Sequence, residues 1–320
     1  MNKYILTAAI GALVGCSNSQ NGEMIEQNPN RDEENLLTSV LQKHSATPEE
    51  RGWAIVLRNG EITAMSKVGV SNYVDATKFC YEPGSVIKPI TAILALESGV
   101  IGSLQDEICT DINEKGYDKL PGDGPHVWPE KMKVADAIVK SSNIVIGKMA
   151  CKVGAERLHD GLESFGFGGD SGFLPSKAKL NSGSISRVGI GQFLLVTPLQ
   201  IAQAYSILAN HGRKFGAAAS QVVKAEVADA VYSELKRVCT DEGTARKAAI
   251  DGFMVAGKTG TSQRVVAGKY AEGCFNATFV GMVDGYVIVV VYECINGSSH
   301  QGGQRPAEAF REIATNLLAQ

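Results

Sequence analysis

Three short groups of polar residues in this chain could together perform serine acyl transfer. The first is in the stretch YEPGSVIKPITAILALESG, where Ser85 and Lys88 stand three residues apart. On a helix the two side chains would share one face. A lysine amine can take the proton of a serine only when the amine is neutral. Because a second positive charge lowers the pKa of an amine, we expect another lysine close to this pair.

The other two groups come later in the chain. Ser141-Ser142-Asn143 opens an apolar, helix-like stretch, and Lys258-Thr259-Gly260-Thr261 lies in a strand-like stretch near the C-terminus. Each group has a plain structural alternative. Ser85 could cap a helix with Lys88 in solvent, Ser141 could be a helix cap, and Thr259-Gly260 could be a strand end. Two further Ser-x-x-Lys sequences, at Ser176 and Ser233, lie in polar contexts without such partners.

Bulk composition excludes some function classes. The net charge of −3 and the absence of basic runs argue against nucleic acid as a partner. No Cys-x-x-Cys occurs, and the five histidines are scattered without the spacing of metal ligands. We therefore expect no metal site and no cofactor.

The N-terminus indicates export. One lysine precedes a short apolar segment that ends in Leu-Val-Gly-Cys at Cys16, which is typical of a signal peptide and resembles a bacterial lipobox. This predicts a lipoprotein-type signal peptide over residues 1–16 and a lipidated Cys16. The mature protein would then be anchored to a bacterial membrane, with the catalytic domain outside the cytoplasm. The alternative is an ordinary secretory peptide or a weak membrane anchor. Export permits disulfides, whose pairing the sequence leaves open.

The patterns along the chain predict strands at both ends and helices between them. Residues 17–34 are polar and are interpreted as a tether, and a short helix is predicted around residues 36–41. Asn59-Gly60 predicts a hairpin within residues 52–66, and Asp284-Gly285 predicts another. Further strands are predicted at 253–260, 275–284 and 286–293, and a last helix at 305–318. The two ends should therefore share one antiparallel sheet.

The ordered set of three groups resembles the motifs of the penicillin-recognising serine acyltransferases. The segments KSSNIVIGK, TPLQIAQAYSILANHG and GKTGTSQ are similar to those of class B penicillin-binding proteins, the monofunctional transpeptidases of division and elongation. The resemblance covers about residues 45–320. Those enzymes normally carry a large N-terminal pedestal domain and a membrane helix, where this chain has a lipobox and a short tether. A division or elongation role therefore stays open.

The resemblance implies an α/β fold of the α+β type, as in penicillin-binding proteins and β-lactamases. An antiparallel five-stranded sheet flanked by helices would join a mostly helical subdomain. One transpeptidase domain would occupy residues 35–320, with the α/β part at about 35–100 and 250–320 and the helical part at about 100–250.

The resemblance also assigns catalytic roles. Ser85 would attack the carbonyl of D-alanyl-D-alanine, and Lys88 would accept its proton. Ser141 would relay a proton to the departing D-alanine. Asn143 would hold Lys88 and the substrate amide, while Lys258 would attract the terminal carboxylate.

Substrate binding would fall to the strand group. Gly260 would let the substrate lie along the strand edge, and the hydroxyls of Thr259 and Thr261 would bind the carboxylate. Backbone N–H groups of Ser85 and Thr261 would form the oxyanion hole. The implied partners are peptidoglycan stem peptides, β-lactam antibiotics as inhibitors and other cell-wall synthesis proteins.

Two other functions remain open at this point. A D,D-carboxypeptidase or a serine β-lactamase would use the same acyl-enzyme, although no clear deacylating glutamate is visible. A non-catalytic sensor or binder of β-lactams or peptidoglycan would keep the site without turnover.

Overall fold

The computed structural model describes residues 31–69, 74–117, 119–216, 219–293 and 301–320. Cys16, the predicted signal peptide and most of the predicted tether lie outside these ranges. The first described helix, α2 (Arg31–His44), begins within the last four residues of the segment interpreted as tether. None of the helices in the described ranges is long and apolar enough to cross a membrane.

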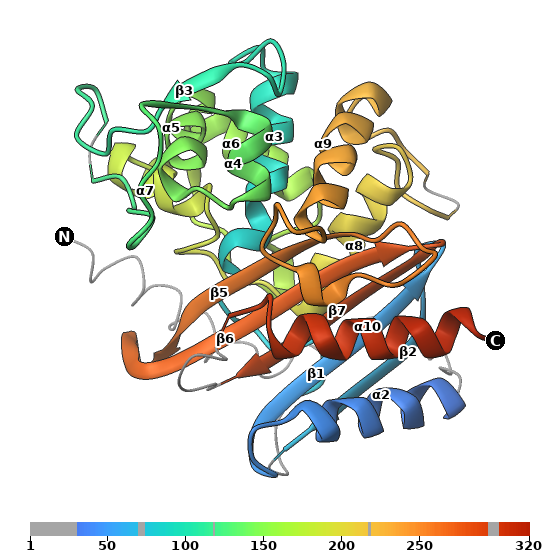
Figure 1. Cartoon of the computed structure of the whole chain (residues 1–320). Coiled ribbons are helices and arrows are strands. Elements are labelled where there is room, and N and C mark those ends of the chain that lie inside the picture. Colours follow the sequence, from blue (N-terminus) through green and yellow to red (C-terminus); the bar gives the residue numbers. More distant parts are fainter. Residues whose placement is uncertain (1–30, 70–73, 118, 217–218, 294–300) are drawn as a thin grey trace.

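Five strands form one antiparallel sheet in the order β2-β1-β7-β6-β5. They are β1 (Arg51–Arg58), β2 (Glu61–Val68), β5 (Ala256–Val266), β6 (Lys269–Val283) and β7 (Tyr286–Glu293). Strand β1 pairs with β7, so the two ends of the chain meet in the middle of the sheet, where blue and red strands lie side by side in Figure 1. The predicted five-stranded antiparallel sheet is confirmed.

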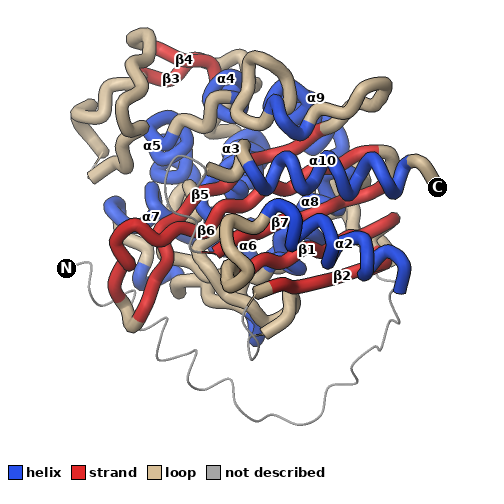
Figure 2. Tube along the Cα trace, turned by 60° about the horizontal axis from the view of Figure 1, so that its bottom comes forward, coloured by secondary structure: helices blue, strands red, loops and turns tan. Residues whose placement is uncertain are grey.

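Helices cover both faces of this sheet. On one face, α2 and α10 (Arg305–Leu318) lie next to each other, as Figure 2 shows. On the other face, α8 (Pro198–Ala209) packs against β1, β6 and β7. This cover explains why the central strand β7 has the sequence YVIVVVYE without polar alternation, since all of its residues are buried.

The middle of the chain forms a mostly helical part above the β5 side of the sheet (Figure 1). Its helices are α3 (Lys88–Glu97), α4 (Val134–Val139), α5 (Asn143–Val153), α6 (Ala155–Ser164), α7 (Ser182–Val188) and α9 (Ala225–Val238). It also contains a small hairpin of β3 (Glu107–Cys109) and β4 (Lys131–Lys133), which the sequence did not predict because three-residue strands show no alternation.

Candidate active site

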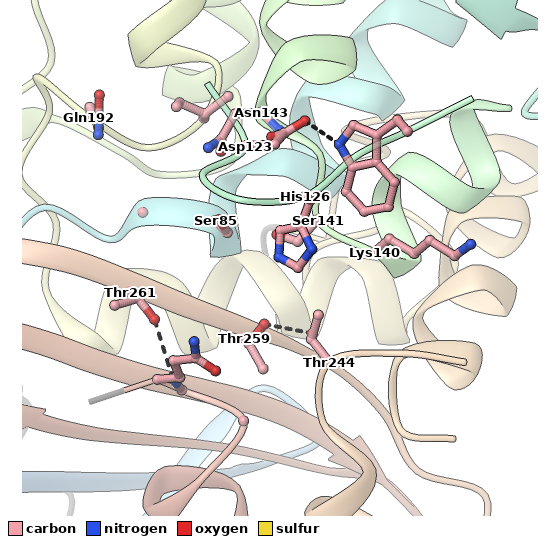
Figure 3. Close-up of a pocket in the computed structure, with 16 residues that line it drawn as sticks. Ser85, Asp123, His126, Lys140, Ser141, Asn143, Gln192, Thr244, Thr259 and Thr261 are labelled. Atoms are coloured by element: carbon pink, nitrogen blue, oxygen red, sulfur yellow. Dashed lines mark hydrogen bonds between the residues drawn. The ribbon is translucent and has the colours of Figure 1, made fainter. Parts of the chain in front are cut away.

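A pocket of about 340 Å³ opens between β5 and the helical part. Its lining includes Ser85, Ser141, Asn143, Thr259 and Thr261, drawn in Figure 3. The structure therefore brings the three predicted groups together, although they come from distant segments of the chain.

Ser85 lies in a 3-10 turn, η1 (Gly84–Ile87), and the α-helix α3 begins only at Lys88. Ser85 therefore occupies a 3-10 turn that runs directly into α3, so it is not part of the α-helix itself. The residues at the N-cap positions are Pro83 for η1 and Ile87 for α3, and neither makes a side-chain cap. The hydroxyl of Ser85 is thus not used as a helix cap, and it faces the pocket.

The turn around Ser85 packs directly against β5. A Cβ atom added to Gly84, whose φ is +58°, would lie 2.6 Å from the carbonyl oxygen of Thr261. A Cβ atom on Gly260 would lie 2.6 Å from the carbonyl oxygen of Pro83. The close approach of turn and strand requires both glycines. Gly260 therefore has a packing role toward the serine turn that the sequence did not indicate.

Two lysine amines meet at one serine hydroxyl. The Nζ atom of Lys88 lies 3.1 Å from Ser141 Oγ, and Lys258 Nζ lies 3.0 Å from the same oxygen. Lys88 Nζ also donates to the carbonyl oxygen of Ser141, and Lys258 Nζ to that of Thr259. Both lysines are fully buried. The second lysine that the chemistry required is therefore in contact with the same group as the first.

Burial changes the protonation of this pair. It lowers the pKa of Lys88 to about 7, against the opposing effect of the Asp123 carboxylate. Burial, and then the positive charge of Lys88, holds the pKa of Lys258 well below its usual range. Two ammonium groups in one desolvated space repel each other. At and above neutral pH at least one amine is thus neutral and able to accept a proton.

Ser141 and Ser142, which precede α5, make different contacts. The hydroxyl of Ser142 accepts from the backbone N–H of Val145 at 3.3 Å and is the N-cap of the helix. Ser141 has a positive φ of 64°, which is unfavourable for serine, and its hydroxyl contacts the two lysines. The alternative that Ser141 is the helix cap is therefore wrong.

The hydrogen bonds of Asn143 differ from the predicted role. Its Nδ2 donates to the carbonyl oxygen of Gly122 at 2.7 Å, and its backbone N–H donates to the carboxylate of Asp123. Within the described ranges, the Lys88 amine hydrogen bonds to Ser141 and to neither Asn143 nor Ser85. The segment at residues 122–123 crosses the start of α5 and offers Asn143 nearer partners. In unliganded sites, catalytic hydrogen bonds commonly tighten only when substrate is present.

Hydroxyl groups line the strand side of the pocket. The hydroxyl oxygens of Thr259 and Thr244 are 2.8 Å apart, and Thr261 Oγ1 accepts from the backbone N–H of Gly302 at 3.4 Å. The side chains of Thr259 and Thr261 point to the same face of β5, because successive side chains of a strand alternate between its two faces. This wall offers neutral donors close to the buried Lys258, an arrangement suited to a carboxylate.

Sequence reasoning missed several lining residues: Asp123, His126, Trp128, Lys140, Gln192 and Thr244. Asp123 is the most connected of them. Its carboxylate accepts from Trp128 Nε1 and Ser142 Oγ, both at 2.7 Å, and from the backbone of Asn143. These residues come from irregular loops without periodicity or fixed spacing, so no local pattern marks them.

The fold and this cluster of a serine, a second serine and two buried lysines define a serine acyltransferase type of site. A family model described as the penicillin binding protein transpeptidase domain matches residues 52–315. The chain belongs to this family, which confirms the resemblance to class B penicillin-binding proteins.

Two curated relatives illustrate the similarity. The chain is 27% identical over 262 residues to a probable peptidoglycan D,D-transpeptidase, PbpC, of Pseudomonas aeruginosa. It is 29% identical over 282 residues to penicillin-binding protein PbpB of Mycolicibacterium smegmatis. Each match includes 74% of this chain but only 46% and 43% of the relative, so the chain spans less than half the length of either.

Solved structures share the fold. The transpeptidase domain of penicillin-binding protein 3 from Burkholderia pseudomallei superimposes with a TM-score of 0.78 at 23% identity, covering 93% of this chain and 97% of that domain. Penicillin-binding protein 3 from Mycobacterium tuberculosis, solved with aztreonam, gives 0.76 at 24% identity, covering 91% and 77%.

Proposed function

We propose that this protein is a peptidoglycan D,D-transpeptidase that works through an acyl-enzyme on Ser85. The observation that carries the proposal is the Ser141 hydroxyl, which lines the same pocket as Ser85 and contacts two fully buried lysine amines behind it. Such a cluster can take a proton from a serine and pass one to a leaving amine. The names of the relatives as D,D-transpeptidases support the same reaction.

In the first half of the reaction, Ser85 Oγ attacks the carbonyl carbon between the two D-alanines of a stem peptide. The proton of Ser85 passes to the neutral Lys88 amine, the hydroxyl of Ser141 delivers a proton to the departing nitrogen, and the Lys88 ammonium then reprotonates Ser141. The C–N bond breaks, D-alanine leaves as an amine, and an ester joins the peptide to Ser85.

Binding and charge stabilisation come from the walls of the pocket. The hydroxyls of Thr259 and Thr261, with Lys258 behind them, hold the terminal carboxylate. The backbone N–H groups of Ser85 and Thr261 form the oxyanion hole, which the close packing of η1 on β5 supports.

In the second half, the neutral amine of another stem peptide attacks the ester carbonyl. The amine nitrogen gives a proton back through Ser141 and Lys88 to Ser85 Oγ, and an amide cross-link forms. A water in place of the amine would make the protein a carboxypeptidase. Among the described lining residues, Asp123 is the one that carries a carboxylate, and three donors already hydrogen bond to it. Because this carboxylate is occupied, it is poorly placed to activate a water, and we expect slow hydrolysis.

The test is intact-protein mass spectrometry after addition of a penicillin, which presents a strained amide beside a carboxylate. We expect one stable adduct that persists for many minutes in the wild type and is absent in Ser85→Ala. Ser176→Ala and Ser233→Ala are the matched controls and should still be labelled. Rapid return to the free mass with continued penicillin consumption would indicate a β-lactamase. If the wild type forms no adduct, the interpretation that remains is a non-catalytic binding module.

We also propose that the protein is exported and held at a bacterial membrane through lipidated Cys16, where stem peptides and other cell-wall synthesis proteins are available. The sequence ending Leu-Val-Gly-Cys supports this. A Cys16→Ala variant should remain unprocessed or become soluble, while the wild type fractionates with membranes. An unmodified N-terminus cut at another residue would contradict the anchor.

A further inference from the structure

An aromatic pair lines the pocket and has no role in the proposed formation of the acyl-enzyme. His126 stacks on Trp128, with ring centroids 5.2 Å apart and ring planes inclined by 17°. Both residues line the pocket, and His126 is exposed. In Figure 3 the ring of His126 lies in front of Ser141. The aromatic surface and the hydroxyl that joins the two lysines therefore line the same pocket.

A hydrogen bond fixes Trp128, on which His126 stacks, to the rest of the site. Trp128 Nε1 donates to Asp123 Oδ2 at 2.7 Å, which is one of the dashed lines in Figure 3. The same carboxylate accepts from Ser142 and from the backbone of Asn143, the residues that follow Ser141. A ligand that binds on the rings would thus meet a surface that is already ordered, which lowers the entropic cost of binding.

The two walls of the pocket differ in chemistry. The strand wall presents threonine hydroxyls and suits a carboxylate. The opposite wall presents the Asp123 carboxylate and two aromatic faces, which attract a cation and pack against an aliphatic chain. Lys140 is the other charged lining residue on this side, and in Figure 3 its amine points away from His126. The pocket is therefore complementary to a carboxylate at one wall and to an aliphatic chain that carries an amine at the other.

The position of Ser141 indicates which substrate reaches the aromatic pair. In the proposed reaction, the leaving nitrogen takes its proton from Ser141. Attack by the acceptor is the same step in reverse, so the incoming nitrogen must also arrive beside Ser141. The departing group is a single D-alanine, whereas the incoming nitrogen is carried on the longer side chain of a whole stem peptide. The acceptor is thus the substrate long enough to extend past Ser141 onto His126.

We propose that His126, Trp128 and Asp123 form the acceptor subsite, and that it selects a primary amine carried on an aliphatic chain. His126 contacts the acceptor, while Asp123 and Trp128 hold the surface in place. The inference rests on the proposed transpeptidase function and adds the residues that choose the acceptor.

The experiment measures how the acyl-enzyme divides between transfer and hydrolysis. The donor is a D-alanyl-D-alanine peptide, and the acceptor probe is Nα-acetyl-L-lysine amide below saturation. In His126→Ala we expect the ratio of transfer to hydrolysis to fall about fourfold, the effect of about one methylene group that is no longer covered by the ring. The rate of penicillin acylation at Ser85 should change less than twofold. Trp128→Phe keeps a ring but loses the hydrogen bond to Asp123, and it should give a smaller fall.

Two controls separate the subsite from general damage. His211→Ala removes another exposed histidine, which hydrogen bonds to Asp229 on α9, and it should leave the ratio unchanged. Labelled D-alanine as acceptor re-forms the donor without using the rings, so its exchange should be insensitive to His126→Ala.

The outcomes distinguish the two proposals. Normal acylation with an unchanged ratio for the lysine amide in both ring variants would overturn the acceptor subsite alone. An equal fall in acylation and transfer would also overturn it, since the rings would then act on the donor. If the wild type forms no adduct on Ser85, the proposed function is wrong and the subsite falls with it.

Discussion

Buried lysines occur in two regions of this molecule, and their surroundings differ. Among the described residues, Lys88 and Lys258 in the pocket and Lys148 on α5 are all fully buried. Lys148 donates to the carbonyl oxygens of Cys109 and Asp111 at 2.9 and 2.6 Å and to the carboxylate of Glu114. It therefore has three acceptors, one of which carries the opposite charge.

Within the described ranges, Lys88 and Lys258 have no such counter-ion in direct contact. Their shared partner is the neutral hydroxyl of Ser141, and each is placed where the other would repel it. The lysines are thus buried in both regions, and the acceptors around each amine decide whether it serves the structure or proton transfer. A lysine with a carboxylate and two carbonyls fixes a loop, whereas two lysines on one hydroxyl give an amine that can lose its proton.

The largest expected effect is in Lys88→Met, which keeps the volume but removes the base. Acylation of Ser85 by penicillin should fall about a thousandfold, the range of general base catalysis. Stability should fall by no more than about 1 kcal/mol, because a buried amine without a counter-ion contributes little to folding. Stopped-flow acylation and urea unfolding measure the two quantities. An unfolded Lys88→Met protein, or one that is acylated normally, would contradict the comparison.

The reverse pattern is expected for Lys148→Met. It leaves the carboxylate of Glu114, which is 39% exposed, and two partly buried carbonyl groups without their donor, so unfolding should become easier by about 2 kcal/mol. Acylation should persist under conditions where the variant is folded. The matched control is Lys43→Met, since Lys43 is 64% exposed and pairs with Glu312 on the surface. That change should stay within about 0.5 kcal/mol. Equal losses in the two variants would show that Lys148 does not anchor its loop.

The pH dependence of acylation sharpens the comparison. The pKa of Lys88 is lowered to about 7, so the amine is protonated below that pH and neutral above it. Acylation should therefore rise with pH and level off above about pH 8, with a rate about tenfold lower at about pH 6. The measurement is the second-order rate with a penicillin across this range, with unfolding followed as a control. A rate that falls as pH rises through 7 would reject Lys88 as the base.

Much of the fold follows from local patterns. The predicted strand at 286–293 and helix at 305–318 coincide with β7 and α10, since each is a run whose burial pattern is visible in its own residues. Asn59-Gly60 and Asp284-Gly285 form the predicted hairpin turns, with positive φ at all four residues. The 3-10 geometry at Ser85 was not predictable, because it occurs where η1 packs on β5, a tertiary contact that no local pattern shows.

The residues of the site also differ in whether the sequence could predict them. Ser85, Ser141 and Lys258 were predictable because each sits in a short group of fixed spacing. Asp123 and His126 were not, because their place depends on contacts across the molecule. The preceding loop is held by Lys148, and Asp123 is held by Trp128 and the start of α5. Such contacts leave no periodic trace in the sequence.

The smallest expected effect is in Asp123→Asn, which keeps the shape of the side chain and removes its charge. The carboxylate of Asp123 raises the pKa of Lys88 against the larger effect of burial, so its loss should lower that pKa further. The rising limb of the acylation profile should therefore move to lower pH, by less than about one unit, because a single charge is removed. The plateau rate should change little, because the amide oxygen can still accept from the backbone N–H of Asn143 and the hydroxyl of Ser142 can turn to accept from the amide nitrogen, while the hydrogen bond from Trp128 Nε1 is lost. Lys140→Gln removes a positive charge on the same side of the pocket and is the matched control, in which the limb should not move to lower pH. A limb that stays fixed in Asp123→Asn, or moves to higher pH, would mean that Asp123 does not act on Lys88 through its charge.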